Sequence, residues 1–256
     1  SLRRVTHYDY WSNKLKKPIL FDSKADLLIY GMGEIALEEL TKAIDKKEDF
    51  KNIRGVCYIS KEPVHEFHQL PSHQECLDDK EKYIDLFDLF YDNNDPIAAK
   101  GLCQRVDSRY LIQNPPCDHL NEDEMDANSN LPFTRELHPY YAKQGAVKCL
   151  ETIKFSIMTH HGCWGECNFC AIGVHQGRTI RTRSEENILK EAKEFNKYRD
   201  YKGIISDVGG PTANMYGYEC KKKLKLGTCD HQRCVDANHL CSTMKVDHSR
   251  NINLLR

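Results

Sequence analysis

The chain carries, at residues 160–170, the segment His160-His161-Gly162-Cys163-Trp164-Gly165-Glu166-Cys167-Asn168-Phe169-Cys170. Its cysteines Cys163, Cys167 and Cys170 have C-x3-C-x2-C spacing and follow a predicted strand. Three thiolates on one tight loop can hold three irons of a [4Fe–4S] cube and leave the fourth iron open, whereas a cluster used only for electron transfer normally has four protein ligands. Gly162 and Gly165 suit such a loop, because glycine adopts backbone conformations closed to other residues. The spacing therefore predicts a catalytic iron–sulfur cluster.

Two other interpretations of these thiols stay open on spacing alone. The cysteines could be buried structural residues, or they could form a zinc site. Zinc knuckles usually show paired C-x2-C or Cys/His spacing, and here Cys167 and Cys170 make such a pair while Cys163 does not.

The cysteine segment, including Phe169 before the third cysteine, resembles the signature of the radical S-adenosylmethionine (SAM) superfamily. A longer match identifies the chain as a member of the YgiQ-type family of radical SAM proteins. Its residues are His7–Trp11, Ala25–Glu34, Gln113–Pro116, Leu131–Arg135, His138-Pro139, Phe155–Ile157, the cysteine segment, His175–Arg178 and Ser206–Tyr216. One departure is His161, where this family favours arginine before the glycine; it changes the charge around a cluster but not its ligands.

The resemblance implies a specific chemistry. The open iron chelates the amino and carboxylate groups of SAM, and one electron from a donor such as flavodoxin or ferredoxin cleaves the sulfonium to a 5′-deoxyadenosyl radical, which abstracts hydrogen from a substrate the sequence does not identify. Phe169, Gly209 and Gly210 then belong to the SAM site, with the two glycines contacting its amino group. The alternative for Gly209-Gly210-Pro211 is a turn that ends a strand.

A second set of cysteines, Cys220, Cys229, Cys234 and Cys241, is interleaved with His231, His239 and His248. Four cysteines are the ligand set of a closed [4Fe–4S] cluster or of a structural zinc; the alternative is a mixture of unpaired surface and core thiols. Nearby, the run Lys221-Lys222-Lys223 is more typical of a solvated face than of a binding patch. Arg178 is a candidate contact for a carboxylate or phosphate, because its planar guanidinium matches those groups. His160, His161 and His175 are either hydrogen-bond donors to the cluster site or ordinary loop histidines.

The N-terminal half predicts an α/β fold. Residues 25–43 read as strand, tight turn and helix, and a second strand, Ile53–Ile59, follows; such a βαβ unit implies a parallel sheet. Residues 73–91 predict one helix, and Arg109–Gln113 predicts a further strand. We expect a flavodoxin-like region that resembles cobalamin-binding domains, without a cobalamin motif. The Gly31–Ala36 segment satisfies a dinucleotide fingerprint, but Ser60-Lys61 stands where an acidic residue is needed.

A second βαβ pattern begins after an irregular, proline-containing connector. Lys154–Thr159 and Gly203–Val208 predict strands, with a helix over Ser184–Tyr198 between them, as at the start of a radical SAM partial (β/α) barrel. The predicted domains are 1–114 (flavodoxin-like), 115–150 (connector) and 151–256 (start of the barrel), truncated at both ends relative to the family. We therefore expect this chain by itself to self-associate or to be poorly ordered beyond Pro211, and to be inactive.

Composition narrows the classes of protein. The chain has 256 residues, 12 cysteines and a net charge of −1. It has no apolar run long enough to span a membrane and no signal-peptide pattern, so we expect a cytoplasmic protein with no membrane partner. The near-neutral charge lacks the basic footprint of a nucleic-acid binder. The alternatives to a radical SAM enzyme of unknown substrate are a tRNA-modifying radical SAM enzyme and a non-catalytic iron–sulfur or zinc-binding module.

Overall fold

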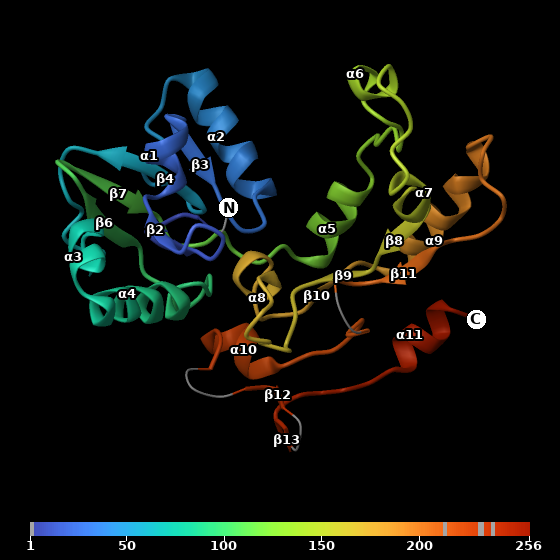
Figure 1. Ribbon diagram of the computed structural model, residues 1–256. Coiled ribbons are helices and arrows are strands. Elements are labelled where there is room, and N and C mark those ends of the chain that lie inside the picture. The colour runs from blue at the N-terminus through green and yellow to red at the C-terminus, as the bar shows by residue number, and fades with distance from the viewer. Residues whose placement is uncertain (1–2, 212–213, 230–232, 237–238) are drawn as a thin grey trace. The chain divides into compact units, whose positions relative to one another are not determined.

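The computed structural model describes residues 3–211, 214–229, 233–236 and 239–256 (Figure 1). Thr212, Ala213 and His231 lie outside the described residues. The chain divides into two units, each described here by itself. Unit 1 comprises Ser1–His119, Gly165–Arg178 and Lys221–Arg233; unit 2 comprises Leu120–Trp164, Thr179–Cys220 and Cys234–Arg256. The predicted domain boundaries near residues 114 and 150 stay predictions. Among the described residues, no helix combines the length and the apolar character that a membrane crossing requires.

Unit 1 is built on a five-stranded mixed sheet with the strand order β3-β4-β7-β6-β5. The strands are β3 (Leu27–Ile29), β4 (Val56–Ser60), β5 (His68–Leu70), β6 (Leu102–Val106) and β7 (Arg109–Gln113). Strands β5 and β6 run parallel, and the other neighbouring pairs run antiparallel. The predicted strand at Arg109–Gln113 is confirmed as β7.

The parallel sheet expected from residues 25–59 is wrong, because β3 and β4 pair antiparallel with Ile29 opposite Val56. Helix α2 (Glu34–Lys46) is 13 residues long and carries the chain about 20 Å away from the end of β3. The helix ends at Lys47 in a left-handed conformation, and residues 47–55 return to the same end of the sheet, where Tyr30 N donates to Gly55 O at 3.0 Å. The connection therefore comes back on itself instead of crossing the sheet.

The helix predicted over residues 73–91 is two helices, α3 (His73–Asp78) and α4 (Lys80–Asp92). Asp79 between them is extended, with φ −139° and ψ 119°. Its carboxylate accepts a hydrogen bond from Glu81 N at 2.9 Å, so it caps α4 in the way that aspartate favours. The helical periodicity of residues 73–91 correctly predicts helix, but it does not reveal the break at Asp79.

The core of unit 1 lies on both faces of the sheet. Helices α3 and α4 cover one face, where Cys76, Leu86 and Phe90 pack with Leu70, Leu102, Leu111 and the buried Cys57. The other face holds Tyr58, Cys103 and Ile112. The remaining elements of unit 1 are β1 (His7–Asp9), β2 (Lys14–Lys16), α1 (Ile19–Ser23), α8 (Ile172–His175) and α10 (Lys221–Leu226). Helix α4 is the element that reaches the cysteine segment.

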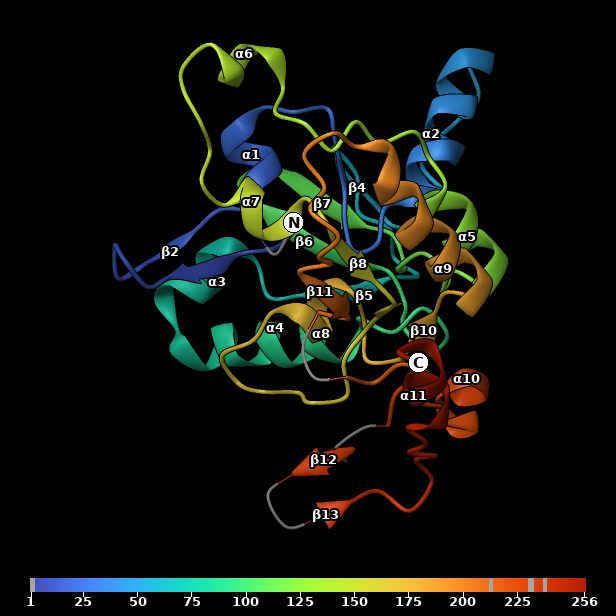
Figure 2. The same cartoon turned by 90° about the vertical axis from the view of Figure 1, so that its right-hand side faces the viewer.

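In unit 2, β8 (Ser156–Met158) and β11 (Asp207–Gly209) pair in parallel, and α9 (Glu185–Glu194) lies between them in sequence. The strand–helix–strand pattern predicted after residue 150 is confirmed, with shorter strands, and Ser184 caps α9 by accepting from Asn187 N at 3.1 Å. Helix α9 lies near the two strands (Figures 1 and 2), and Ile157, Ile188 and Phe195 belong to the core of this unit. The short helix Phe195–Lys197 continues α9.

The other elements of unit 2 are short. They are α5 (Glu122–Ser129), α6 (Pro139–Ala142), α7 (Leu150–Ile153), β9 (His160–His161), β10 (Arg181–Thr182), β12 (Val235–Asp236), β13 (His239–Leu240) and α11 (Ser249–Leu254). Strands β12 and β13 pair as a hairpin (Figure 2). In the part of unit 2 that the structure describes, β8 and β11 form a two-stranded sheet.

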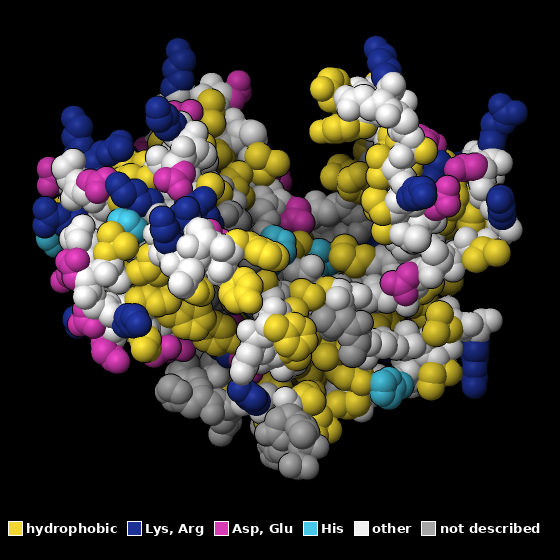
Figure 3. Space-filling model, in the orientation of Figure 1, with side chains coloured by type: hydrophobic (Ala, Val, Ile, Leu, Met, Phe, Trp, Pro, Cys, Tyr) yellow, Lys and Arg dark blue, Asp and Glu magenta, His cyan; other side chains and the backbone are white. Residues whose placement is uncertain are grey.

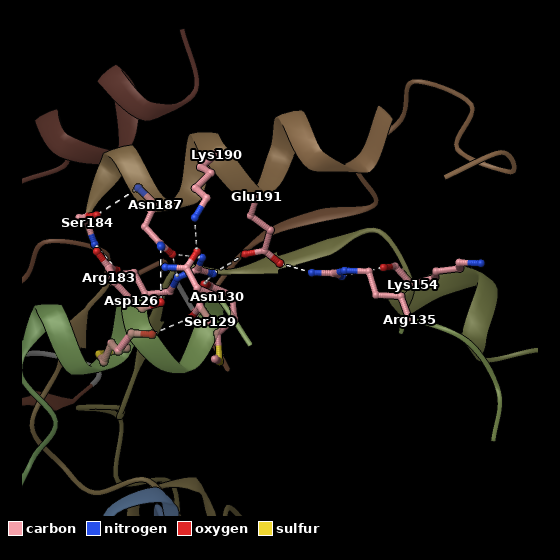
Figure 4. A network of polar contacts seen from close by, with 12 residues as sticks. Asp126, Ser129, Asn130, Arg135, Lys154, Arg183, Ser184, Asn187, Lys190 and Glu191 are labelled. Carbon is pink, nitrogen blue, oxygen red and sulfur yellow. Dashed lines mark hydrogen bonds and ion pairs between the residues drawn. The ribbon is translucent and has the colours of Figure 1, made fainter. Parts of the chain in front are cut away.

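A buried polar network fastens α9 to β8 (Figure 4). Arg183, which is 3% exposed, forms an ion pair with Glu191 at 2.6 Å and donates to Met158 O at 2.8 Å. Arg135 forms a second ion pair with Glu191 and donates to Lys154 O at 2.8 Å. Charge-assisted hydrogen bonds of this kind are the strong ones, so the network holds in place the strand that leads into the cysteine segment.

Candidate functional site

The first cysteine of the triplet is reached from the sheet of unit 2. Strand β9 follows β8 and pairs antiparallel with β10, with His161 opposite Arg181. Gly162 then turns the chain with φ +83°, a conformation that favours glycine, and Cys163 follows. Cys163 is 7% exposed and Trp164 is 1% exposed; the Trp164 ring lies 5.7 Å from that of Tyr218. Local strand pairing therefore places Cys163 in a buried position.

The second and third cysteines belong to unit 1 and share one turn. Cys170 N donates to Cys167 O at 2.9 Å, which brings the backbones of the C-x2-C pair close together. Cys167 is exposed and Cys170 is partly buried, and Phe169 is 92% exposed. Within the described residues, neither Cys167 nor Cys170 is in a disulfide, so neither sulfur is bonded to another cysteine.

A pocket of about 780 Å³ within unit 1 lies beside this turn. Its walls include Cys167, Cys170 and Phe169 from the cysteine segment, Phe87 and Tyr91 from α4, and Cys229. Burial, together with the nearby charge of Glu166, raises the pKa of Tyr91, so its phenol stays protonated at neutral pH. The pocket thus combines soft sulfur donors with aromatic surface.

A salt bridge that no pattern in the sequence indicated holds the cysteine segment. Glu166, with φ +44°, forms an ion pair with Arg178, and their side chains are 7% and 14% exposed. Arg178 also donates to Thr228 Oγ1 at 2.7 Å, and Lys223 Nζ donates to Arg178 O at 2.7 Å. Burial lowers the pKa of Arg178, but the hydrogen bond and charge of Glu166 outweigh it and raise that pKa above its ordinary value.

These contacts change two interpretations made from the sequence. Arg178 is engaged inside the protein with Glu166 and Thr228, so a carboxylate or phosphate ligand would compete with these partners. Lys223 is 2% exposed, so the reading of the lysine run as a solvated face is wrong for that residue, while Lys221 and Lys222 are exposed. Both side chains are used to tie residues 166–178 to residues 221–228.

The candidate glycines lie in unit 2 at the end of β11. Gly209 is opposite Met158 in the parallel register, and Gly209 O accepts a hydrogen bond from Thr159 N at 2.7 Å. Gly210 follows directly and packs against His160, since a Cβ atom placed on Gly210 would lie 2.1 Å from the imidazole Cε1 and Nε2. The glycine turn is therefore adjacent to the strand that leads to Cys163.

The second cysteine set is divided between the units. Cys229 lines the pocket of unit 1, whereas Cys220, Cys234 and Cys241 belong to unit 2. There Cys220 Sγ and Cys241 Sγ lie 3.6 Å and 3.1 Å from Thr243 Oγ1, and Cys241 N donates to Cys234 O at 2.9 Å. No pattern in the sequence indicated that Cys229 would line the same pocket as Cys167 and Cys170.

Among the described residues, no three or more His, Cys, Asp or Glu side chains gather closely enough to hold a metal ion. Cys163 stands in unit 2, and Cys167 and Cys170 in unit 1. The donor chemistry nevertheless suits an iron–sulfur cluster, because thiolates are the ligands that such clusters use and two of the three cysteines line one pocket.

Comparisons with known proteins identify the family of the chain. The family model described as "Radical SAM N-terminal" matches residues 1–156. A UPF0313 protein of Fusobacterium nucleatum subsp. nucleatum is 57% identical over 256 residues, which is 100% of this chain and 45% of that protein. UPF0313 proteins of Clostridium perfringens and Clostridium botulinum are 45% and 42% identical, again over 100% of this chain and over 39% and 40% of their own lengths.

The chain thus spans less than half the length of these curated relatives. The family match covers more than half of the chain, and the likeness to the UPF0313 proteins extends over all of it. The chain belongs to the radical SAM N-terminal family, in its YgiQ-type, UPF0313 group.

Proposed function

We propose that the protein to which this chain belongs is a radical SAM enzyme whose [4Fe–4S] cluster is held by Cys163, Cys167 and Cys170. When bound, the cluster and SAM supply the chemistry of reductive sulfonium cleavage to a 5′-deoxyadenosyl radical, with an electron from a flavodoxin- or ferredoxin-type donor. The observation that carries the proposal is the cysteine segment itself, which begins at a paired strand and places Cys167 and Cys170 on one turn beside a pocket.

The chain's own residues have separate parts in this proposal. Cys163, Cys167 and Cys170 supply three thiolates. Phe169 is the aromatic side chain of the segment that would meet the cofactor. Gly209 and Gly210 would bind the amino group of SAM through their backbone, since the turn that they form follows a strand end, where active sites of barrel-type proteins lie.

The test uses the full-length protein, reconstituted anaerobically with iron and sulfide. We expect about four irons per chain at the triplet and reductive cleavage of SAM to 5′-deoxyadenosine. Each of the variants Cys163→Ser, Cys167→Ser and Cys170→Ser should lose cleavage by at least about 100-fold, because a cube held by two thiolates loses its metal.

Cys149→Ser is the matched control, because Cys149 is exposed and is not one of the pocket residues. It should retain the iron content and the cleavage rate of the wild type. Wild-type cleavage by any one of the three triplet variants would remove that cysteine from the ligand set. A wild type that binds iron but leaves SAM intact would favour a non-catalytic iron–sulfur module.

The same samples test a second metal site at Cys220, Cys229, Cys234 and Cys241. If those cysteines bind iron or zinc, the wild type holds metal beyond the triplet's share, and Cys220→Ser or Cys234→Ser reduces that excess. Cys229→Ser is informative in addition, because Cys229 lines the same pocket as Cys167 and Cys170. An effect of Cys229→Ser on the triplet's iron alone would assign it to the cluster pocket instead.

A further inference from the structure

Within unit 2, the imidazole of His160 lies directly against the backbone of Gly210. A Cβ atom at Gly210 would be 2.1 Å from Cε1 and Nε2 of His160 and 2.6 Å from Cδ2. Non-bonded carbon atoms pack at roughly 3.5–4.0 Å. Even the smallest side chain at position 210 would therefore require the imidazole or the glycine turn to move.

The imidazole has little room to move, because it is buried and the neighbouring Thr159 is itself held by hydrogen bonds. His160 is 0% exposed, and its Nδ1 lies 2.9 Å from Thr159 Oγ1. Thr159 is itself held on two sides: its N–H donates to Gly209 O at 2.7 Å, and its carbonyl accepts from Arg183 N at 3.0 Å. His160 further pairs with Thr182 across β9 and β10.

The neighbouring glycine has a different environment. A Cβ atom at Gly209 would meet the carboxylate oxygens of Asp207 at 3.6 Å and 3.8 Å, which are ordinary contacts. Packing therefore requires glycine at position 210 and tolerates alanine at position 209. Any need for glycine at position 209 would have to come from a bound ligand.

We propose that His160 is a positioning residue for the SAM site. The imidazole packs against Gly210. It thereby sets the distance between the Gly209–Gly210 turn and the strand that continues through Gly162 to Cys163. This inference rests on the proposed function, since the turn matters in this way only if it binds SAM. The histidine thereby couples two candidate parts of the site that are distant in sequence.

The experiment uses the full-length protein, with equilibrium binding of SAM to the reconstituted sample and thermal unfolding of the apo protein. We expect Gly210→Ala to lower the apo Tm by roughly 3 °C or more through overpacking and to weaken SAM binding at least about tenfold. Gly209→Ala should leave the apo Tm unchanged within about 1 °C while weakening SAM binding.

Variants of His160 separate positioning from simple stability. His160→Ala should weaken SAM binding about tenfold without changing the iron content, because the turn loses its support. His160→Phe keeps a planar ring at the contact and should retain SAM affinity within about threefold. The double variant Gly210→Ala/His160→Ala should regain at least half of the Tm lost in Gly210→Ala, since the clash is removed.

The outcomes are distinguishable. SAM affinity of wild-type strength in His160→Ala would overturn the positioning role while leaving the proposed function intact. A double variant no more stable than Gly210→Ala would overturn the steric contact. A wild-type protein that binds iron but no SAM would overturn both proposals, and the Tm series would still report on the His160–Gly210 contact by itself.

Discussion

Burial determines the chemistry of the dispersed cysteines one residue at a time. Removal from water raises the pKa of the Cys57 thiol to about 12 and those of Cys76 and Cys117 to about 11, because the thiolate is the form that burial disfavours. The thiol form is unreactive toward alkylating agents. These residues therefore behave as packing groups.

We expect alkylation with iodoacetamide at pH 8 to leave Cys57 and Cys76 unmodified in the folded apo protein, while the exposed Cys149 and Cys167 react. Peptide mass spectrometry measures the modification at each site. The same reaction in urea, where all four should be modified, is the control. Rapid labelling of Cys57 in the folded protein would contradict its burial.

The raised pKa of Cys57 also makes the free energy of unfolding depend on pH. Its ordinary value is 9.0 and its folded value is about 12, so the folded state holds the proton more tightly. The resulting contribution to stability is complete below pH 9 and is lost as the pH rises toward 12. Replacing Cys57 by alanine should remove this loss of unfolding free energy between about pH 9 and 12, as urea denaturation at a series of pH values would show. The substitution also leaves a cavity, which lowers the stability at every pH.

At the scale of elements, Arg178 connects the cysteine segment, through its ion pair with Glu166, to α10, through its backbone carbonyl. Both side chains are buried, and residues 166 and 178 bracket Cys167, Cys170 and α8. The Arg178 side chain also donates to Thr228 Oγ1, and Lys223 of α10 donates to the backbone carbonyl of Arg178, so two separate segments of unit 1 meet at this one residue. A local break here should loosen the turn that presents Cys167 and Cys170.

We expect Arg178→Gln to lower the free energy of unfolding by about 3 kcal/mol, because it leaves the Glu166 carboxylate buried without its cation. Lys42→Gln is the matched control, since it breaks an exposed ion pair with Glu38, and should cost no more than about 0.5 kcal/mol. Urea unfolding measures both. Equal effects of the two changes would show that the buried pair contributes no more than a surface pair.

At the scale of the whole molecule, several large hydrophobic side chains of unit 2 are exposed. Phe133, Tyr140 and Tyr141 are 59%, 64% and 56% exposed, and Figure 3 shows hydrophobic side chains in yellow at the tip of α6. In the described part of unit 2, the sheet consists of β8 and β11, and two-stranded sheets are marginally stable by themselves.

We therefore expect the 256-residue chain to self-associate, since exposed apolar surface and open strand edges favour association. Sedimentation velocity over a tenfold range of concentration measures it. The variant Tyr140→Ser/Tyr141→Ser should reduce association, and the control Tyr10→Ser, at another exposed tyrosine of unit 1, should not. A wild-type chain that sediments as one monomer at every concentration would contradict this expectation.

Local signals in the sequence were sufficient for several features. The cysteine spacing led to the family, because ligand spacing is a property of a short segment. The helix start predicted at Ser184 was correct, and the pattern over residues 154–208 correctly predicted a parallel pair, since the strands and the helix there follow one another closely. The strand over Arg109–Gln113 was likewise correct.

Other features depended on contacts between residues far apart in the chain. Strand β4 runs antiparallel to β3 because residues 47–55 return the chain to the end of β3 from which α2 starts. The periodicity of the sequence does not encode this return. The partners of Arg178 and the place of Cys229 in the pocket beside Cys167 and Cys170 follow from the packing of residues 221–229 in unit 1.

The sequence by itself thus determined the family and predicts the three cluster ligands, because both depend on residue type and short spacing. The tertiary structure decided which strands pair and in which direction, and which charged side chains are buried. It also requires glycine at position 210, because His160, which lies 50 positions earlier in the sequence, occupies the space that a side chain would need. Such steric requirements arise only when distant segments pack at van der Waals distance.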